Sequence, residues 1–377
     1  MTAAVHVLLV SAQAAPNLLP ALDPALKPAE AVLLVSQTMR PRADALQRVL
    51  QEAGVRVSRV ALPDEHDYPA LESALLALAA ERAGETIALN VTGGTKLMAL
   101  AAQSIAQDAG WALFYVDADT DEVIWLGERA GERQALHEQM RLRHYLMGYG
   151  FSVPEKLLTL QTSEPRKRLI ATLLNQIGSL EQPLSQLNWL AQQAEDRKAL
   201  SLQLDERQRD SRSLDALLRA FSEAGILTVQ GARVSFGGAD ALAFAKGGWL
   251  EHHVFRTVAS LADELGLRDK AANLEVTNSE GVKNELDVAF LAHNRLFVIE
   301  CKSARMDHPR APKANDTLFK LAEIRRRVGG LGARGLLASY RPLREAEQRL
   351  ARTLDLSLVC GAELARLDDR LRAWVGG

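Results

Sequence analysis

Four ionisable residues are spaced by two in the segment Lys283–Ser303, KNELDVAFLAHNRLFVIECKS. Glu285 and Asp287 lie in its first half, and Glu300 and Lys302 lie in its second half. Residues i and i+2 of a β-strand point to the same face. The spacing therefore predicts two strands on which each pair shares a face, and a hairpin of these strands would bring the four groups together.

The turn of this hairpin is expected at His293-Asn294, and most other residues of the segment are apolar. Ionised side chains within an apolar hairpin are costly unless they are paired or bound to a metal. Two carboxylates and a backbone carbonyl suit a hard divalent cation such as Mg²⁺ or Mn²⁺. A lysine two residues after the second carboxylate is placed to orient or deprotonate an attacking water. A hairpin held at a sheet edge by salt bridges stays open as the simpler interpretation.

NELDV followed by IECKS resembles the PD-(D/E)xK motif of nucleases with a restriction-endonuclease-like fold, although the usual proline before the aspartate is absent. The resemblance implies a metal held by Asp287, Glu300 and the Cys301 carbonyl, with Lys302 positioning the attacking water. Gly248-Trp249-Leu250-Glu251 resembles the start of the helix that precedes this core, so Glu251 is implied as an additional metal-site glutamate and counted with the catalytic residues. Glu285 either supports this site or pairs with Lys302.

The net charge of −2 hides an asymmetry along the chain. Met1–Glu164 carries 13 Lys and Arg against 20 Asp and Glu, whereas Arg295–Arg352 carries 14 against 6. A basic segment next to the candidate site suits a polyanionic substrate, because neutralisation of phosphates dominates affinity for nucleic acids. Lys320 would lie on the helix after the second strand, where it either faces the phosphate or is a surface lysine.

The first third of the chain alternates apolar strand patterns with helical patterns. Such alternation predicts a parallel, Rossmann-like sheet, which binds ligands at the carboxyl ends of its strands. The strands are expected at 5–10, 31–35, 55–60, 86–90 and 111–116, and the helices at 41–53, 68–83 and 92–109.

Asn90–Lys96, NVTGGTK, falls at one of these strand ends. Its glycines allow close approach of a ligand to the backbone, and the following helix start offers free N–H groups. Neither the GxxxxGK[ST] nor the GxGxxG spacing is present. The segment predicts a turn that binds a phosphate or nucleotide, and a turn that merely caps the helix is the alternative.

NVTGGTKLMALAA resembles the signature of CARF domains, the Rossmann-like sensors of CRISPR-associated proteins. The resemblance covers roughly residues 1–135 and implies a cyclic oligoadenylate bound across the two-fold axis of a homodimer. The Ser11–Asn17 and Ser36–Thr38 loops fall where other CARF strands contact their ligand. The expected ligand-binding residues are Ser11, Gln13, Asn17, Thr38, Asn90, Thr92, Gly93, Gly94, Thr95 and Lys96.

Between the two motifs, Glu128–Met147 is expected to be helical, as are Pro165–Leu180 and Ser185–Lys198. Asp210–Ala224 followed by two short strands around Gln230-Gly231 looks like a winged helix-turn-helix. Because SLDALLRAFSEAG carries a single arginine, we interpret it as a linker and dimerisation element rather than a DNA reader. The C-terminal pattern predicts helices at 251–265, 312–328 and 344–353 and further strands at 273–278, 335–339 and 356–360.

We therefore expect an α/β protein with three parts. These are a CARF domain at 1–148, a helical, winged-helix-like linker at 149–240, and a PD-(D/E)xK nuclease domain at 241–377. The two cysteines exclude a disulfide framework and a zinc site. No run of 18 apolar residues exists, and the N-terminus lacks the basic start of a signal peptide. We expect a cytoplasmic protein without membrane contact.

Together the two motifs resemble the CARF–PD-(D/E)xK effectors of type III CRISPR systems. That resemblance implies a homodimeric endonuclease of antiviral defence that is activated by cyclic tetra-adenylate, needs Mn²⁺ or Mg²⁺, and cuts DNA, RNA or both. The alternative is a ligand-responsive winged-helix transcription regulator whose nuclease fold is silent, but this leaves the complete set of Asp287, Glu300 and Lys302 unexplained. A nucleotide-metabolising Rossmann enzyme is disfavoured, because no acidic ribose-binding residue follows a suitable strand.

Overall fold

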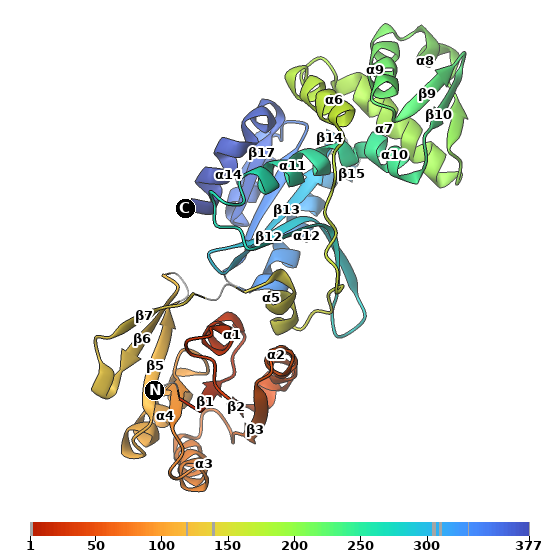
Figure 1. The fold of residues 1–377 in the computed structure, drawn as a ribbon. Helices are drawn as coiled ribbons and strands as arrows, with labels where there is room; N and C mark the ends of the chain where they lie inside the picture. Colours follow the sequence, from red (N-terminus) through yellow and green to blue (C-terminus); the bar gives the residue numbers. More distant parts are fainter. Residues whose placement is uncertain are drawn as a thin grey trace.

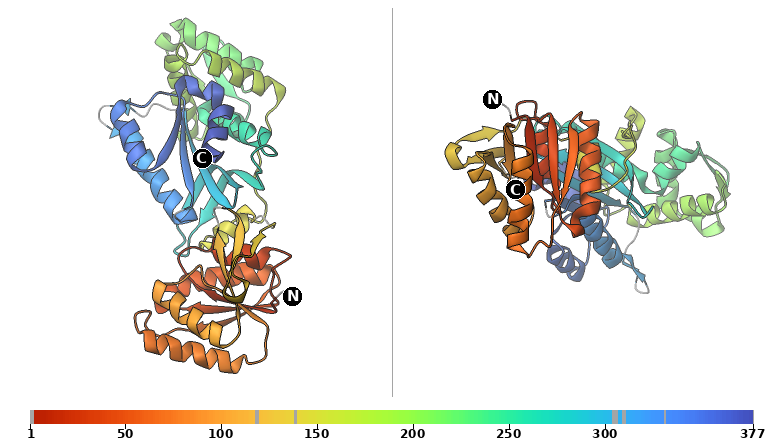
Figure 2. Two further views of the ribbon diagram at one scale, coloured as in Figure 1. Left: turned by 90° about the vertical axis from the view of Figure 1, so that its left-hand side faces the viewer. Right: turned by 90° about the horizontal axis from the view of Figure 1, so that it is seen from below.

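The computed structural model describes residues 3–117, 120–137, 140–303, 307–308, 311–330 and 332–376. Figure 1 shows an N-terminal α/β unit, a small unit of helices and short strands, and a C-terminal α/β unit. In Figure 1 and the left view of Figure 2, the C-terminal unit lies between the other two. The spatial order of the three parts therefore differs from their order along the chain.

The N-terminal unit contains a seven-stranded sheet in the order β3-β2-β1-β4-β5-β6-β7. Strands β1 to β5 are parallel, and β6 and β7 are antiparallel to their neighbours. Apolar side chains are buried on both faces, as expected for a parallel sheet covered by helices. The elements are β1 Val5–Leu9, α1 Ala15–Leu22, β2 Glu30–Val35, η1 Gln37–Met39, α2 Arg40–Glu52, β3 Arg56–Ala61, α3 Tyr68–Glu81, β4 Ile87–Asn90, α4 Lys96–Asp108, β5 Ala112–Asp117, β6 Glu122–Leu126, η2 Gly127–Arg129, β7 Arg133–Ala135 and α5 Leu142–Gly148.

Two predictions for this unit are wrong in detail. The helix expected over Glu128–Met147 forms only as α5, and the preceding described residues belong to η2 and the edge strand β7. The strand β6 was not predicted, because charged residues follow its short apolar pattern. In the structure Val123 and Trp125 are buried, and β6 pairs with β5. Helix α4 begins at Lys96 rather than Thr92, because the Thr95 side chain caps it by accepting from the Met98 N–H.

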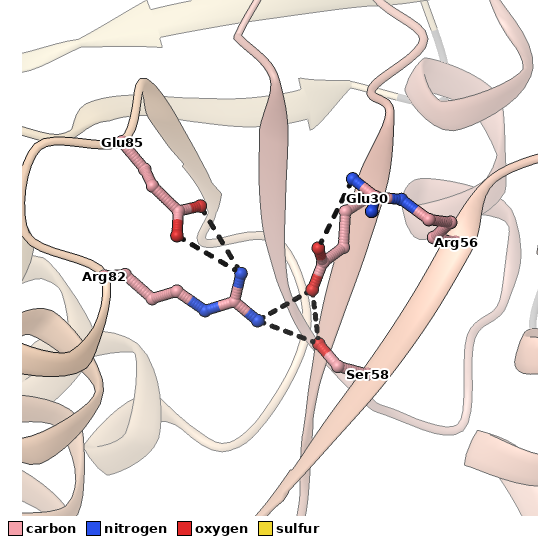
Figure 3. A network of polar contacts seen from close by, with 5 residues as sticks. All are labelled: Glu30, Arg56, Ser58, Arg82 and Glu85. Carbon is pink, nitrogen blue, oxygen red and sulfur yellow. Dashed lines mark hydrogen bonds and ion pairs between the residues drawn. The ribbon is translucent and has the colours of Figure 1, made fainter.

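A polar network joins residues near the amino-terminal ends of the strands β2 and β3 (Figure 3). This is the end of the sheet opposite the predicted ligand loops. Glu30 at the start of β2 accepts hydrogen bonds from Arg82 at 2.7 Å and from Ser58 of β3 at 2.8 Å. Arg82 also pairs with Glu85. The Arg82 hydrogen bond is the main cause that lowers the pKa of Glu30. The network ties the end of α3 to the strands β2 and β3.

The middle unit has the order of helices and strands of a winged helix. The three-stranded sheet β8-β10-β9 packs with α7 and α9 around one apolar cluster. Arg219, the cation considered in the sequence, is ion-paired with Asp215 at 2.5 Å. The elements are α6 Glu164–Asn175, α7 Glu181–Asp196, β8 Ser201–Gln203, α8 Glu206–Asp210, α9 Arg212–Glu223, β9 Leu227–Gln230, β10 Arg233–Phe236 and α10 Ala239–Ala243.

The C-terminal unit is built on a five-stranded sheet in the order β11-β12-β13-β16-β17. The first three strands are antiparallel and the last two are parallel to β13. The predicted helix 251–265 ends earlier, and the last helix was not predicted. The elements are the π-helix η3 Phe244–Gly248, α11 Trp249–Ser260, β11 Asp269–Thr277, β12 Lys283–Ala292, β13 Arg295–Lys302, β14 Asp307–His308, β15 Ala311–Pro312, α12 Lys313–Gly329, β16 Arg334–Ser339, α13 Glu345–Thr353, β17 Leu356–Cys360, η4 Gly361–Arg366 and α14 Leu367–Gly376.

The predicted hairpin turn at His293-Asn294 is confirmed. Both residues have left-handed φ angles, 47° and 54°, which is the conformation of a two-residue turn that matches the twist of the flanking strands. The ladder continues from Ala292↔Arg295 to Val288↔Ile299. This register fixes which charged side chains face one another.

The N-terminal and C-terminal units contact each other directly. One apolar cluster continues from the N-terminal sheet through α5 to the α12 side of the C-terminal sheet. The Tyr145 hydroxyl donates to the Gly329 carbonyl at 3.0 Å, and the Tyr149 hydroxyl donates to Gln13 Oε1 at 2.7 Å. Asn294 Nδ2 donates to Asp121. The hairpin and the end of α12 are therefore in contact with the N-terminal unit, and the predicted division at residues 148 and 240 stays a prediction.

In the part of the chain that the structure describes, no helix is both long enough and apolar enough to span a bilayer.

Candidate active site and ligand loops

Asp287 and Glu300 face each other where the strands β12 and β13 separate. The ladder ends at Val288↔Ile299, so the next opposing pair is Asp287 and Glu300. Asp287 Oδ2 instead accepts from the backbone N–H of Cys301 at 2.7 Å. The Asp287 carboxylate thus takes the place of a backbone partner for β13 where the ladder ends.

Lys302 completes this group at the end of β13. Its Nζ lies 2.6 Å from Glu300 Oε1 and 3.9 Å from Asp287 Oδ2. The side chains of Glu300 and Asp287 are 8% and 15% exposed, whereas that of Lys302 is 33% exposed. The structure therefore brings together the three residues of the predicted motif, with the ammonium on the solvent side of the two carboxylates.

Burial and mutual repulsion act on these groups. Burial raises the pKa of Asp287 to about 7; Glu300 adds to the rise and Lys302 opposes it. Burial alone would lower the pKa of Lys302, but the Glu300 and Asp287 carboxylates raise it above its ordinary value. A carboxyl group with a raised pKa beside a second carboxylate has too little positive charge around it, which is the condition that a bound cation relieves.

Glu251 approaches the same group from the first turn of α11. Burial raises its pKa, and the nearby Glu285 carboxylate raises it further, so both glutamates lie within electrostatic reach of one another. Gly247 precedes this helix with a φ of 147°, and a Cβ there would lie 2.1 Å from the Ser303 hydroxyl oxygen. The glycine therefore allows the start of α11 to lie against the residue that follows Lys302.

The donors fit a hard divalent cation in part. Asp287, Glu300 and the Cys301 backbone supply the oxygen ligands that Mg²⁺ and Mn²⁺ prefer. Burial raises the pKa of the Cys301 thiol, so this residue would contribute its carbonyl oxygen. Among the described residues, no group of three His, Cys, Asp or Glu side chains is arranged to hold a metal ion. The role of Glu251 as a direct ligand therefore stays a prediction.

Lys320 and Asn273 of this domain lie in different environments. Lys320 is exposed on α12. Asn273 on β11 was not predicted as a site residue, yet its side-chain amide lies beside the Glu251 carboxylate and acts to lower the pKa of that group. Its φ of 47° is left-handed although it lies within a strand. The sequence did not predict this conformation, because a single asparagine does not by itself indicate a left-handed backbone.

Two of the predicted ligand loops follow β1 and β4, which are neighbours in the sheet, and the Ser36–Thr38 loop follows β2. The chain turns to opposite sides of the sheet from this pair, so the loops lie at the topological switch point where α/β sheets bind ligands. The loops touch closely: a Cβ at Gly93 would lie 2.1 Å from the Leu9 carbonyl oxygen. Gly94 has a φ of 74°. Both glycines are thus required by the backbone of this turn.

Buried amides hold these loops together. Asn90 Nδ2 donates to Asn17 Oδ1 at 3.0 Å, and Asn17 Nδ2 donates to the Leu9 carbonyl at 2.9 Å. Asn90 Oδ1 accepts from the Thr92 N–H and hydroxyl. Asn17 and Asn90 are 1% and 0% exposed. Their positions do not support the expectation that they contact a ligand directly, because their polar groups are used inside the protein.

The other predicted ligand residues differ in exposure. Lys96 and Thr38 are exposed, Ser11, Gln13, Thr92, Gly94 and Thr95 are half-buried, and Gly93 is buried. Thr38 lines a cavity of about 450 Å³ together with the 61–66 segment after β3, which the sequence did not indicate. Gln13 points to Tyr149 and Gly330 rather than to the TGGT turn. The structure thus divides the predicted set into surface residues and residues that support them.

Comparison with known proteins agrees with this division into two sites. Residues 5–145 match the family model of the Card1 CARF domain, and residues 239–376 match that of the Card1-like endonuclease domain. The chain joins a CARF domain to an endonuclease domain. No curated protein matches the chain. The predicted fold class, with a CARF domain, a nuclease domain and helices between them, is confirmed.

Solved structures resemble this chain over most of its length. Protein VC1899 from Vibrio cholerae is 28% identical, with a TM-score of 0.90, and 99% of this chain and 98% of that chain are covered. Can2 from Sulfobacillus thermosulfidooxidans, in complex with cyclic tetra-adenylate, is 24% identical with a TM-score of 0.81 and the same coverage. A type III CRISPR defence DNA nuclease activated by cyclic oligoadenylate is 21% identical with a TM-score of 0.58, covering 90% of this chain and 46% of that chain.

Proposed function

We propose that this chain is a metal-dependent endonuclease of type III CRISPR antiviral defence that is activated by cyclic tetra-adenylate. It acts as a homodimer and hydrolyses phosphodiester bonds of DNA, RNA or both without sequence specificity. The observation that carries the proposal is the meeting of Asp287, Glu300 and Lys302 at a strand opening inside a Card1-like endonuclease domain. The fold shared with Can2, whose structure contains cyclic tetra-adenylate, supports the choice of activator.

In this proposal each residue of the nuclease domain has a defined task. Asp287, Glu300 and the Cys301 carbonyl hold Mn²⁺ or Mg²⁺, and Glu251 assists from α11. A divalent cation in this position supplies charge stabilisation to the phosphoryl oxygens in the transition state. Lys302 orients the attacking water from the solvent side, where its ammonium already contacts both carboxylates. The arginines and Lys320 of α12 favour a polyanionic substrate nearby.

The activator is proposed to bind at the Thr92–Lys96 turn. Lys96 is exposed at the start of α4, where its charge and the free N–H groups of the helix favour a phosphate. Thr38 and the adjoining cavity offer space for other parts of the ring. Asn17 and Asn90 contribute by fixing the loops, as the buried hydrogen bonds between them indicate.

Activation needs a connection between the two sites, and a short one exists. Gln13 belongs to the loop after β1 and accepts from Tyr149, while Gly330 at the end of α12 lies against both side chains. The middle unit, α6 to α10, lies on the other side of the nuclease domain (Figure 1). We therefore favour transmission from the Ser11–Asn17 loop directly to α12.

A cleavage assay tests the proposal. Labelled single- and double-stranded DNA and RNA are incubated with the protein and Mn²⁺, with and without cyclic tetra-adenylate or cyclic hexa-adenylate. We expect cleavage with Mn²⁺ and cyclic tetra-adenylate together and no cleavage in EDTA. Absence of cleavage of all four substrates under these conditions would remove the proposed activity, and full activity in EDTA would remove the metal.

A further inference from the structure

Strand β11 changes its backbone conformation at one residue opposite the catalytic aspartate. The register runs from Ala272↔Val288 to Leu274↔Leu286, which places Asn273 opposite Asp287. Asn273 has a φ of 47°, whereas strand residues have strongly negative φ values. Backbone outliers of this kind cost about 1–3 kcal/mol and persist where the surroundings hold them, often at functional sites.

The Asn273 side chain reaches the acidic group from this position. Its amide lies beside the Glu251 carboxylate and opposes the rise in the pKa of Glu251 that burial and Glu285 produce. Only the amide nitrogen of an asparagine can donate to a carboxylate, so Nδ2 is the atom that would face Glu251. Asn273 therefore links the edge strand β11 to the first turn of α11.

The other end of the amide has no protein partner. Asn273 Oδ1 is buried and accepts no hydrogen bond from the residues that the structure describes. A buried acceptor left in this way costs about 1–3 kcal/mol. Asparagine is tolerated in the left-handed region, but glycine would satisfy the same backbone without burying a polar group. The conformation alone therefore does not account for an asparagine here.

We propose that Asn273 is a positioning residue of the catalytic centre. Its amide nitrogen holds the Glu251 carboxylate beside Asp287, and its amide oxygen is available to accept from a water bound with the divalent cation. This inference rests on the proposed nuclease function and deepens it. It assigns a role in the metal centre to β11, a strand outside the Asp287, Glu300 and Lys302 motif.

Two substitutions separate the backbone from the side chain. Asn273→Gly keeps the left-handed conformation and removes the amide, whereas Asn273→Asp keeps the shape and turns the donor into a carboxylate facing Glu251. His293→Gly is the matched control, because His293 has the same φ of 47° and is exposed in the hairpin turn. Thermal melting of the metal-free proteins checks that all three variants fold.

Direct Mn²⁺ binding, followed by electron paramagnetic resonance of the free ion, is the first readout, and the Mn²⁺ dependence of cleavage at saturating cyclic tetra-adenylate is the second. Partners that orient metal ligands are typically worth 10–100-fold in affinity or activity. We expect the Asn273→Gly protein to need a Mn²⁺ concentration at least about 10-fold higher than the wild type in both assays. Its affinity for cyclic tetra-adenylate should be unchanged. Asn273→Asp should shift the pH dependence of Mn²⁺ binding, and His293→Gly should behave like the wild type.

Wild-type Mn²⁺ binding by a folded Asn273→Gly protein would overturn the inference and leave the nuclease function intact. If the wild type binds Mn²⁺ but cleaves none of the substrates, the proposed function fails, while weaker Mn²⁺ binding by the variant would still support the role of Asn273 in the metal centre.

Discussion

The ligand loops of the CARF domain and the catalytic strands of the nuclease domain both lie at the ends of β-strands, but they are built from different groups. In the loops, the neutral amides of Asn17 and Asn90 are fully buried and use their hydrogen bonds inside the protein. In the nuclease domain, Asp287 and Glu300 are buried together with one ammonium between them and solvent.

This difference separates a preformed site from an electrostatically incomplete one. A neutral network of satisfied hydrogen bonds keeps its shape without a ligand. A pair of buried carboxylates keeps its charge only where enough positive charge is near, and the raised pKa of Asp287 indicates that Lys302 alone does not supply it. The comparison predicts that ligand affinity at the CARF site is most sensitive to a change of shape, whereas the cleavage rate at the nuclease site is most sensitive to a change of charge.

The largest effect is expected from removing charge at the nuclease site. Glu300→Gln and Lys302→Ala should lower the cleavage rate by on the order of 10³-fold, because preorganised charges act on the transition state. The affinity for cyclic tetra-adenylate should stay the same. Rates on labelled substrates and calorimetric ligand binding measure the two quantities. Glu275→Gln, on β11 and ion-paired with Lys283, is the control. A Lys302→Ala protein that still cleaves normally would contradict the assignment.

Removing the buried charge should also change stability in a pH-dependent way. The pKa of Asp287 is raised to about 7 from 3.8, so its contribution to stability is present below pH 3.8 and is lost as the pH rises through 7. In EDTA, Asp287→Asn should therefore gain stability over the wild type as the pH rises from 4 to 8. The gain is a few kcal/mol at most, at about 1.4 kcal/mol per pKa unit. Urea unfolding at several pH values measures it, and a difference independent of pH would argue against the raised pKa.

The CARF site should instead be sensitive to a small change of shape. In Gly93→Ala the new Cβ would meet the Leu9 carbonyl at 2.1 Å, and overpacking of this kind costs about 1–3 kcal/mol. We expect the affinity for cyclic tetra-adenylate to fall by about 10–100-fold, since 1.4 kcal/mol corresponds to tenfold. Gly178→Ala is the control, because nothing lies within 4 Å of its added Cβ. Unchanged affinity in Gly93→Ala would place the ligand elsewhere.

The contact between the two sites should affect activation without affecting either site alone. Tyr149→Phe removes the hydroxyl that donates to Gln13, and a single hydrogen bond contributes about 0.5–1.5 kcal/mol. We expect about a fivefold loss of ligand-stimulated cleavage, with ligand affinity within twofold of the wild type. Tyr115→Phe, at an exposed tyrosine of β5, is the control. Full activation of Tyr149→Phe would favour a route through another contact.

The smallest effect is expected from the exposed charge of the CARF site. Lys96→Ala removes a solvent-exposed cation, and such charges contribute about 1 kcal/mol or less and are screened by salt. The affinity for cyclic tetra-adenylate should fall about three- to fivefold at low salt and less at high salt. Lys156→Ala serves as the control at an exposed lysine outside the loops. A loss as large as that of Gly93→Ala would show that charge dominates this site as well.

Much of both sites was predictable from local sequence patterns. Alternation along the strands placed Glu300 and Lys302 on one face, and the His293-Asn294 pair marked the turn that brings Asp287 opposite them. Less was predictable where a residue acts through distant partners. Asn17 and Asn90 resembled ligand donors until their mutual hydrogen bond was visible. The strand β6 was not predicted, because the charged residues that follow it obscure its short apolar pattern.

By itself, the sequence determined the strand periodicity, the glycines of the TGGT turn and the set of charges that we propose to hold a metal, because these depend on neighbours within a few residues. Only the tertiary structure decided that the nuclease domain lies against the CARF domain (Figure 2), that Gln13 contacts Tyr149 and that Asn273 meets Glu251. These contacts join residues from separate elements, and they form only when the sheets and helices pack. The burial that raises the pKa of Asp287 arises in the same way.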